Sequence, residues 1–134
     1  MEKQFIPYEE ALALKELGFD EFCFAYFRDK KITGVNKFDR KVYDFHVIAK
    51  KDVTAITNEI VLAPLWQQVF DWFRDKKLYH CEVDYNEYYQ YYQGILYDLR
   101  TNDIISDTIG YDSKTHKEAA LACLKKLIEI VKNK

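Results

Sequence analysis

The scarcity of glycine and proline is the sequence feature that most constrains how this chain can fold. Four Gly and two Pro occur in 134 residues, about a third of average usage. Hydrophobic side chains make up 49% of the chain and the net charge is only -2, a composition that excludes a disordered chain. We therefore expect few long flexible loops. The length of the chain indicates a single domain over residues 1–134.

Hydrophobic periodicity predicts two helices in the first half of the chain. The first runs from about Pro7 to Leu17 and ends at Gly18, which can adopt the left-handed conformation of a helix C-cap. The second begins at Pro64. Its apolar stripe, widened by a further tryptophan, should dock on a sheet. The stripe contains Leu62, Leu65, Trp66, Val69, Phe70 and Phe73, with Trp72 beside it.

A third helix is predicted at the C-terminal end of the sequence, opening near residues 113–115. Thr115 and Glu118 have the spacing of a capping box, in which a hydroxyl and a carboxylate satisfy free backbone N–H groups. The expected buried stripe is Ala120, Leu121, Leu124, Leu127, Ile128 and Val131.

Five segments are expected to form strands, although the first could also be a buried helix. They are Phe22–Phe27, apolar on both faces, and the alternating segments Val42–Ala49, Tyr79–Tyr85, Tyr88–Leu99 and Ile104–Ile109. Residues 50–61 fit either a helical turn or an ordered loop. The order α-β-β-α-β-β-β-α predicts an α+β fold, with a mostly antiparallel sheet of about five strands and helices packed on it.

Catalytic and cofactor motifs are missing from the sequence. Neither of the two serines lies in G-x-S-x-G, the four glycines are isolated, and there is no C-x-x-C or H-E-x-x-H. We therefore expect no enzyme, no cofactor and no metal site, with Cys-based catalysis kept as an alternative. Cys23, Cys81 and Cys123 are odd in number and far apart in sequence, which indicates buried thiols in a reducing compartment rather than a disulfide framework.

Residues 79–112 are rich in tyrosine and acid. They hold eight Tyr and seven acids against one base, Arg100. The simplest interpretation is a tyrosine-rich sheet, half core and half solvent. If Tyr89 and Tyr91 face the helices with the other odd positions of their strand (Ile95, Tyr97 and Leu99), the even positions face outward. Exposed Tyr beside acids suits protein binding and repels phosphates. The expected contact residues are Tyr88, Tyr92, Glu87 and Asp98, with no nucleic-acid partner.

Residues 28–51 have the opposite charge, with eight Lys or Arg against three Asp. A solvated hairpin with a turn around residues 34–36 is the simplest interpretation. As an alternative function, the chain could bind a small molecule or nucleotide, acting as a sponge. Aromatic rings would then stack the base, and the basic 28–51 segment would hold the phosphate.

Three stretches resemble small uncharacterised proteins carried by phages and prophages of gut bacteria. They are I-P-Y-E-E-A-L-A-L-K-E-L-G-F-D-E (6–21), A-P-L-W-Q-Q-V-F-D-W-F-R (63–74) and the tail Y-D…E-A-A-L-A-C-L-K-K-L-I-E-I-V (111–131). Residues 62–131 are also similar to the helix–strands–helix arrangement of the phage ABA sandwich domain. Together with the missing catalytic motifs and the acidic Tyr surface, the resemblance leads us to expect a non-enzymatic accessory protein of the host cytoplasm. It would act by binding a host or phage protein, for example to inhibit a host defence, or a second copy of itself. The resemblance carries over no functional residue.

No apolar run approaches the roughly 20 residues that a membrane-spanning helix needs. No basic stretch followed by an apolar run and a cleavage site opens the chain. We therefore expect no membrane association and a cytoplasmic location.

Overall fold

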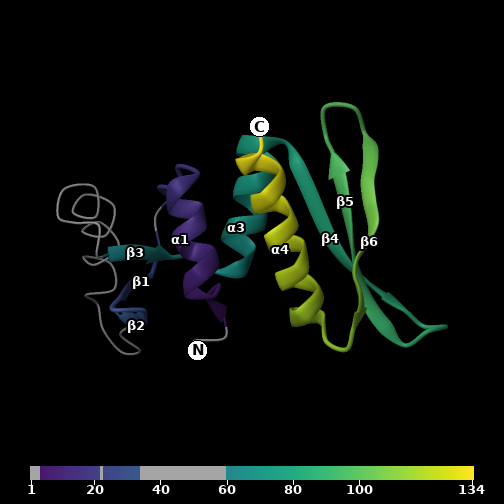
Figure 1. Cartoon of the computed structure of the whole chain (residues 1–134), viewed down its shortest axis with the longest axis horizontal. Coiled ribbons are helices and arrows are strands. Elements are labelled where there is room, and N and C mark those ends of the chain that lie inside the picture. The colour runs from purple at the N-terminus through teal and green to yellow at the C-terminus, as the bar shows by residue number, and fades with distance from the viewer. Residues whose placement is uncertain (1–3, 22, 34–59) are drawn as a thin grey trace. The chain divides into compact units, whose positions relative to one another are not determined.

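The computed structural model describes residues 4–21, 23–33 and 60–134. It confirms the α+β fold class (Figure 1). In the described part of the chain the strands form two antiparallel sheets of three strands each, however, and not the one sheet of about five strands that the sequence predicts. The chain divides into two compact units, residues 1–69 and 70–134. The single domain over residues 1–134 stays a prediction.

Helix α1 (Tyr8–Glu16) opens the first unit where the sequence predicts a helix. Pro7 is the N-cap rather than the first helical residue, and Leu17 is the C-cap. Gly18 has φ +93°, and its N–H donates to the Lys15 carbonyl, while the Phe19 N–H donates back to the Leu14 carbonyl at 3.0 Å. This Schellman ending confirms the expected role of Gly18.

The first sheet has the order β2-β1-β3 and is antiparallel, with strands β1 (Ala25–Arg28), β2 (Lys31–Thr33) and β3 (Ile60–Ala63). Asp29 and Lys30 join β1 to β2 with φ of 52° and 65°. Positive φ at both central residues marks a type I′ hairpin turn. The ring of Tyr8 on α1 packs edge-on against Phe27 of β1, with 5.4 Å between centroids.

The expectation that residues 22–27 form a strand covered on both faces is wrong for the described positions. Cys23, Ala25 and Phe27 are buried, whereas Phe24 is exposed and Tyr26 is half-buried. The segment therefore alternates as a strand with one covered face. The predicted turn at residues 34–36, the strand Val42–Ala49 and residues 50–59 of the ambiguous segment lie outside the described residues.

The helix predicted after Pro64 is present as α3 (Trp66–Trp72), followed by a π-helical turn, η2 (Phe73–Lys77). Val69 and Phe73 of the predicted apolar stripe are fully buried, and Trp72 beside it is nearly so. Leu65, Trp66 and Phe70 of the same stripe are only half-buried. Leu62 belongs to β3 instead. Leu78, with φ 62° and ψ 35°, ends the π turn and directs the chain into the second sheet.

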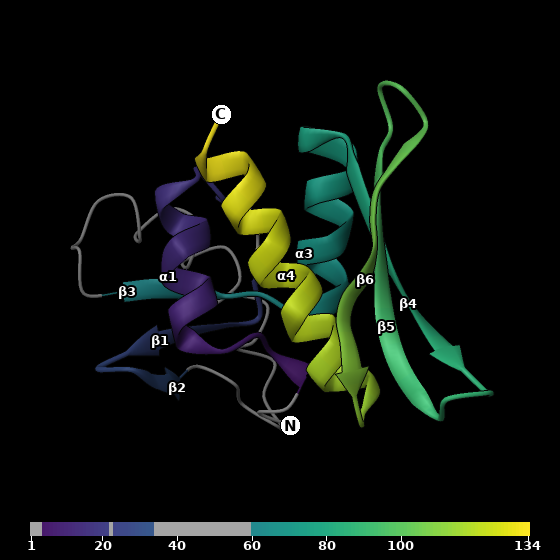
Figure 2. The same cartoon turned by 45° about the vertical axis from the view of Figure 1, so that its right-hand side comes forward.

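The second sheet has the order β4-β5-β6, with β4 (Tyr79–Asn86), β5 (Tyr91–Asp98) and β6 (Asp103–Ser113) all antiparallel. Helix α4 (His116–Lys132) contacts all three strands and lies along one face of this sheet (Figure 1). The β4–β5 and β5–β6 turns lie at opposite ends of the sheet (Figure 2).

The predicted orientation of β5 is wrong. Gly94 and Leu96, at even positions, are buried beneath α4, and they pair with Val83 and Cys81 of β4. The odd positions Ile95 and Tyr97 pair with Glu82 and His80 on the face that α4 does not cover. Tyr89 is exposed in the turn before the strand, and Leu99 is exposed after it. A side chain at residue 94 would overlap the Cys123 sulfur of α4. The helix can therefore pack closely only on the face of β5 that carries Gly94.

Helix α4 begins at the predicted cap. The Thr115 hydroxyl accepts a hydrogen bond from the Glu118 N–H at 3.1 Å, and the Glu118 carboxylate accepts from the Lys114 N–H at 3.0 Å. The carboxylate thus bonds one residue before the position that a capping box predicts. Leu121 and Val131 are half-buried rather than buried. The buried residues are Ala119, Ala120, Cys123, Leu124, Leu127 and Ile128.

Thr115→Ala should lower the free energy of unfolding by about 1 kcal/mol, because the N–H of Glu118 loses its acceptor at the helix start. Urea denaturation followed by circular dichroism measures this loss. Thr115→Ser keeps the hydroxyl and should stay close to wild type. A serine variant as unstable as the alanine variant would show that the hydroxyl does not cap the helix.

Candidate functional site

Four tyrosine rings form a continuous group at the β4–β5 end of the second sheet, which we call the tyrosine cluster: Tyr88, Tyr89, Tyr91 and Tyr111. Tyr88 packs edge-on against Tyr89, with ring centroids 4.7 Å apart. Tyr89 stacks on Tyr91 at 5.7 Å, and Tyr91 meets Tyr111 of β6 edge-on at 6.5 Å. Edge-to-face and offset pairs at these separations are favourable aromatic contacts.

The backbone of the β4–β5 turn fixes the two outermost rings. The side-chain oxygen of Asn86 accepts hydrogen bonds from the N–H groups of Tyr88, at 3.0 Å, and Tyr89, at 3.1 Å. The Gln90 N–H donates to the Asn86 carbonyl at 2.8 Å, and Gln90 takes φ 57° to return the chain into β5. Asn is suited to this position because its short amide side chain can bond the backbone of the residues that follow.

The tyrosine cluster is mostly open to solvent and has acids beside it. Tyr88 is 85% exposed, Tyr89 64% and Tyr111 59%. Glu87 and Asp112, next to Tyr88 and Tyr111 in the chain, are also exposed. The chain has no Lys or Arg from residue 79 to residue 99. The result is an apolar surface with phenolic hydroxyls and a negative border.

The four predicted contact residues do not form one patch. Glu87 lies in the β4–β5 turn, as expected. Tyr88 lies in the same turn and not, as predicted, at the start of the next strand, because β5 begins only at Tyr91. Tyr92 is half-buried on the face covered by α4, with its ring 6.0 Å from that of His116 and 4.9 Å from that of Tyr85. The prediction that Tyr92 faces outward, away from the helices, is therefore wrong, for the same reason as the orientation of β5.

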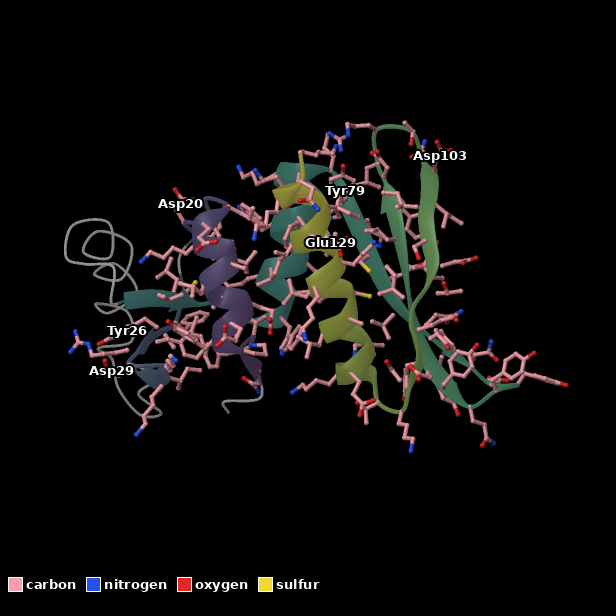
Figure 3. All side chains as sticks on the ribbon, viewed as in Figure 1. Asp20, Tyr26, Asp29, Tyr79, Asp103 and Glu129 are labelled. Atoms are coloured by element: carbon pink, nitrogen blue, oxygen red, sulfur yellow. The ribbon has the colours of Figure 1, made fainter. Side chains whose placement is uncertain are left out.

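Asp98 lies at the far end of β5, beside the β5–β6 turn. Its carboxylate accepts hydrogen bonds from the backbone N–H of Arg100 at 2.9 Å and from the guanidinium at 3.2 Å. Both bonds lower the pKa of Asp98, and the bond from the backbone N–H has the larger effect. The Arg100 guanidinium also lies over the ring of the buried Tyr79, and so does the ammonium of Lys134. Figure 3 shows Tyr79 and Asp103 at this end of the sheet. Asp98 thus has a local structural role.

The uncovered face of the sheet carries a polar group around Glu82. The Tyr97 hydroxyl donates to the Glu82 carboxylate at 3.1 Å, and His80 Nε2 lies 3.6 Å from the same carboxylate. The bond to Glu82 raises the pKa of Tyr97, because a carboxylate disfavours the phenolate. His80 also stacks on Tyr97, with 6.0 Å between centroids. Glu82 therefore has two partners, Tyr97 and His80.

The three cysteines are buried free thiols. The Cys23 thiol donates to the Glu21 carbonyl at 3.4 Å, and burial raises its pKa to about 12. Cys81 and Cys123 contact each other across the β4–α4 interface, and this contact raises the pKa of Cys81 and lowers that of Cys123. Sequence reasoning missed this pair, although it placed both residues on apolar faces. In the residues that the structure describes, no three His, Cys, Asp or Glu side chains gather to hold a metal ion.

No family model matches the chain, and no curated protein or solved structure matches it significantly. None of the helices within residues 4–21, 23–33 and 60–134 is both long enough and apolar enough to span a membrane.

Proposed function

We propose that this chain is a non-enzymatic binding protein whose tyrosine cluster contacts another protein. The observation that carries the proposal is the continuous contact of Tyr88, Tyr89, Tyr91 and Tyr111 at an exposed turn. Isolated exposed aromatics are common on protein surfaces and need no explanation, whereas a contiguous exposed group indicates an interaction site.

The tyrosine cluster suits a protein partner on energetic grounds. Tyrosine offers a large contact area with few rotatable bonds, so little side-chain entropy is lost on binding. The Asn86 hydrogen bonds already order the two most exposed residues of the cluster. Because the exposed acids Glu87 and Asp112 are the chain neighbours of Tyr88 and Tyr111, a partner segment bearing Arg or Lys suits the surface in charge, and its guanidinium groups can stack on tyrosine.

The resemblance to phage and prophage proteins suggests an accessory protein of the host cytoplasm, with a host protein, a phage protein or a second copy of the chain as the partner. The nucleotide-binding alternative stays a prediction, since most of residues 28–51 lies outside the described residues. Cys-based catalysis likewise stays an untested alternative.

Replacing Tyr88 and Tyr89 together by alanine should weaken partner binding roughly thirtyfold or more, the scale of an interface hot spot. Folding stability should change by less than about 1 kcal/mol, because both side chains are exposed. The partner is first identified by cross-linking in host cells that express the tagged chain. Its affinity is then measured by titration with the wild-type and variant proteins.

Tyr85→Ala is the matched control for this experiment. Tyr85 lies in the same hairpin and is 45% exposed, but it contacts Tyr92 on the face that α4 covers. Its replacement should leave partner affinity within about threefold of wild type, because single surface contacts outside a hot spot contribute little. Equal losses for the two variants would show that the hairpin as a whole matters, and unchanged affinity in the double variant would refute the proposal.

A further inference from the structure

Two thiols meet in the core of the second unit, between strand β4 and helix α4. Cys81 is 8% exposed and Cys123 only 1% exposed. The residues are far apart in sequence, and packing of α4 on the sheet brings them together. Sulfur atoms are visible between α4 and the strands in Figure 3.

Helix α4 packs closely on the sheet, and the Cys123 sulfur lies against β5. This sulfur lies so close to Gly94 of β5 that a methyl group at residue 94 would overlap it. Gly94 pairs with Val83, and the next inward-facing residue of β4 is Cys81. The two thiols interact directly, and this interaction shifts the pKa of both. The two sulfurs are therefore neighbours.

We propose that Cys81 and Cys123 are an oxidation site, at which a peroxide converts the two thiols into a reversible disulfide linking β4 to α4. The Cys123 thiolate attacks one peroxide oxygen and the O–O bond breaks, which gives a sulfenic acid and, with hydrogen peroxide, one water. The Cys81 thiol then attacks the sulfenic sulfur. The S–S bond forms, the S–O bond breaks, and a second water leaves with the Cys81 proton. Two electrons pass from the two thiols to the peroxide.

The contact between the thiols lowers the pKa of Cys123 and raises that of Cys81. These directions favour Cys123 as the thiolate that attacks the peroxide and leave Cys81 as the second thiol. Because both side chains are buried, the peroxide reaches them only when α4 opens locally from the sheet, so the reaction should be slower than oxidation of an exposed thiol.

Cys23 provides an internal control. Its thiol bonds the Glu21 carbonyl, and its pKa of about 12 leaves almost no thiolate at neutral pH. It should stay reduced while the other two cysteines react.

The test treats the folded full-length chain with hydrogen peroxide, removes the peroxide with catalase, and denatures the protein in excess N-ethylmaleimide. Intact mass should show a product lighter by two hydrogen atoms that takes up one maleimide, where the untreated chain takes up three. Peptide mapping without reductant should link the Cys81 peptide to the Cys123 peptide. Dithiothreitol should restore three reactive thiols.

Cys23→Ala should form the same product, whereas Cys81→Ala and Cys123→Ala should not. The wild-type peptide map tests the proposal even if these two variants fold poorly. Three maleimides after treatment, over-oxidation without a cross-link, or a cross-link that involves Cys23 would each overturn it.

Discussion

Replacing Phe73 by alanine should lower the free energy of unfolding by about 3–5 kcal/mol, the usual loss for a fully buried aromatic residue. Phe73 is 0% exposed and packs edge-on against Trp72, with 5.0 Å between ring centroids. It also stands where α3 passes into the π turn. The truncation therefore leaves a cavity at the start of the second unit, where the backbone has little freedom to close it.

Urea denaturation of the Phe73→Ala variant measures this loss. Phe24→Ala is the matched control, because it makes the same truncation at a residue that is 43% exposed. It should lose only about half as much stability, since the transfer free energy scales with the buried area. Equal losses for the two variants would contradict the assignment of Phe73 to the core.

The helices were predictable because their signals are local. Thr115 and Glu118 start α4, and Gly18 ends α1 where a residue with positive φ is needed. The hairpin between β1 and β2 was missed, because Asp29-Lys30 is a rarer type I′ pair than Asn-Gly.

The orientation of β5 could not be derived from alternation, because both faces of the strand carry large apolar residues. Ile95 and Leu96 are neighbours in this strand, and so are Tyr91 and Tyr92. What distinguishes the faces is the space needed by α4, which approaches Gly94 closely. That constraint comes from a helix packed on the sheet and has no signature within the strand itself.

Only part of the candidate site could be predicted, because the rest depends on which face of β5 is covered by α4. The sequence places Glu87 in a turn, but it assigns Tyr88 to the strand that follows, whereas the hydrogen bonds to Asn86 hold Tyr88 in the turn. The contact of Tyr91 with Tyr111 and that of Cys81 with Cys123 depend on register and helix packing. Neither contact can be inferred when β5 is assigned to the wrong face.

Gly110→Ala should cost about 2–5 kcal/mol, because two penalties add at this position. Gly110 of β6 has φ +60°, a left-handed conformation that disfavours any residue with a Cβ atom by about 1–2 kcal/mol. A methyl group there would also lie 2.8 Å from the Ala122 Cβ and 3.0 Å from the Ser113 Oγ. The Ala122 Cβ is fixed to the backbone of α4, so relieving the overlap must shift the helix, at a cost of about 1–3 kcal/mol.

Gly18→Ala separates the two penalties, because Gly18 has φ +93° but nothing lies within 4 Å of an added methyl group. It should lose only the conformational part, about 1–2 kcal/mol. Adding Ala122→Gly to Gly110→Ala should recover part of the larger loss, although a glycine within a helix itself costs about 1 kcal/mol. A double-mutant cycle then measures the coupling between residues 110 and 122. Equal losses at Gly18 and Gly110, with no coupling to Ala122, would mean that α4 does not press on β6 at this point. Measurable coupling would support the close approach of α4 to the sheet, the same packing that buries Gly94 and brings Cys123 to Cys81.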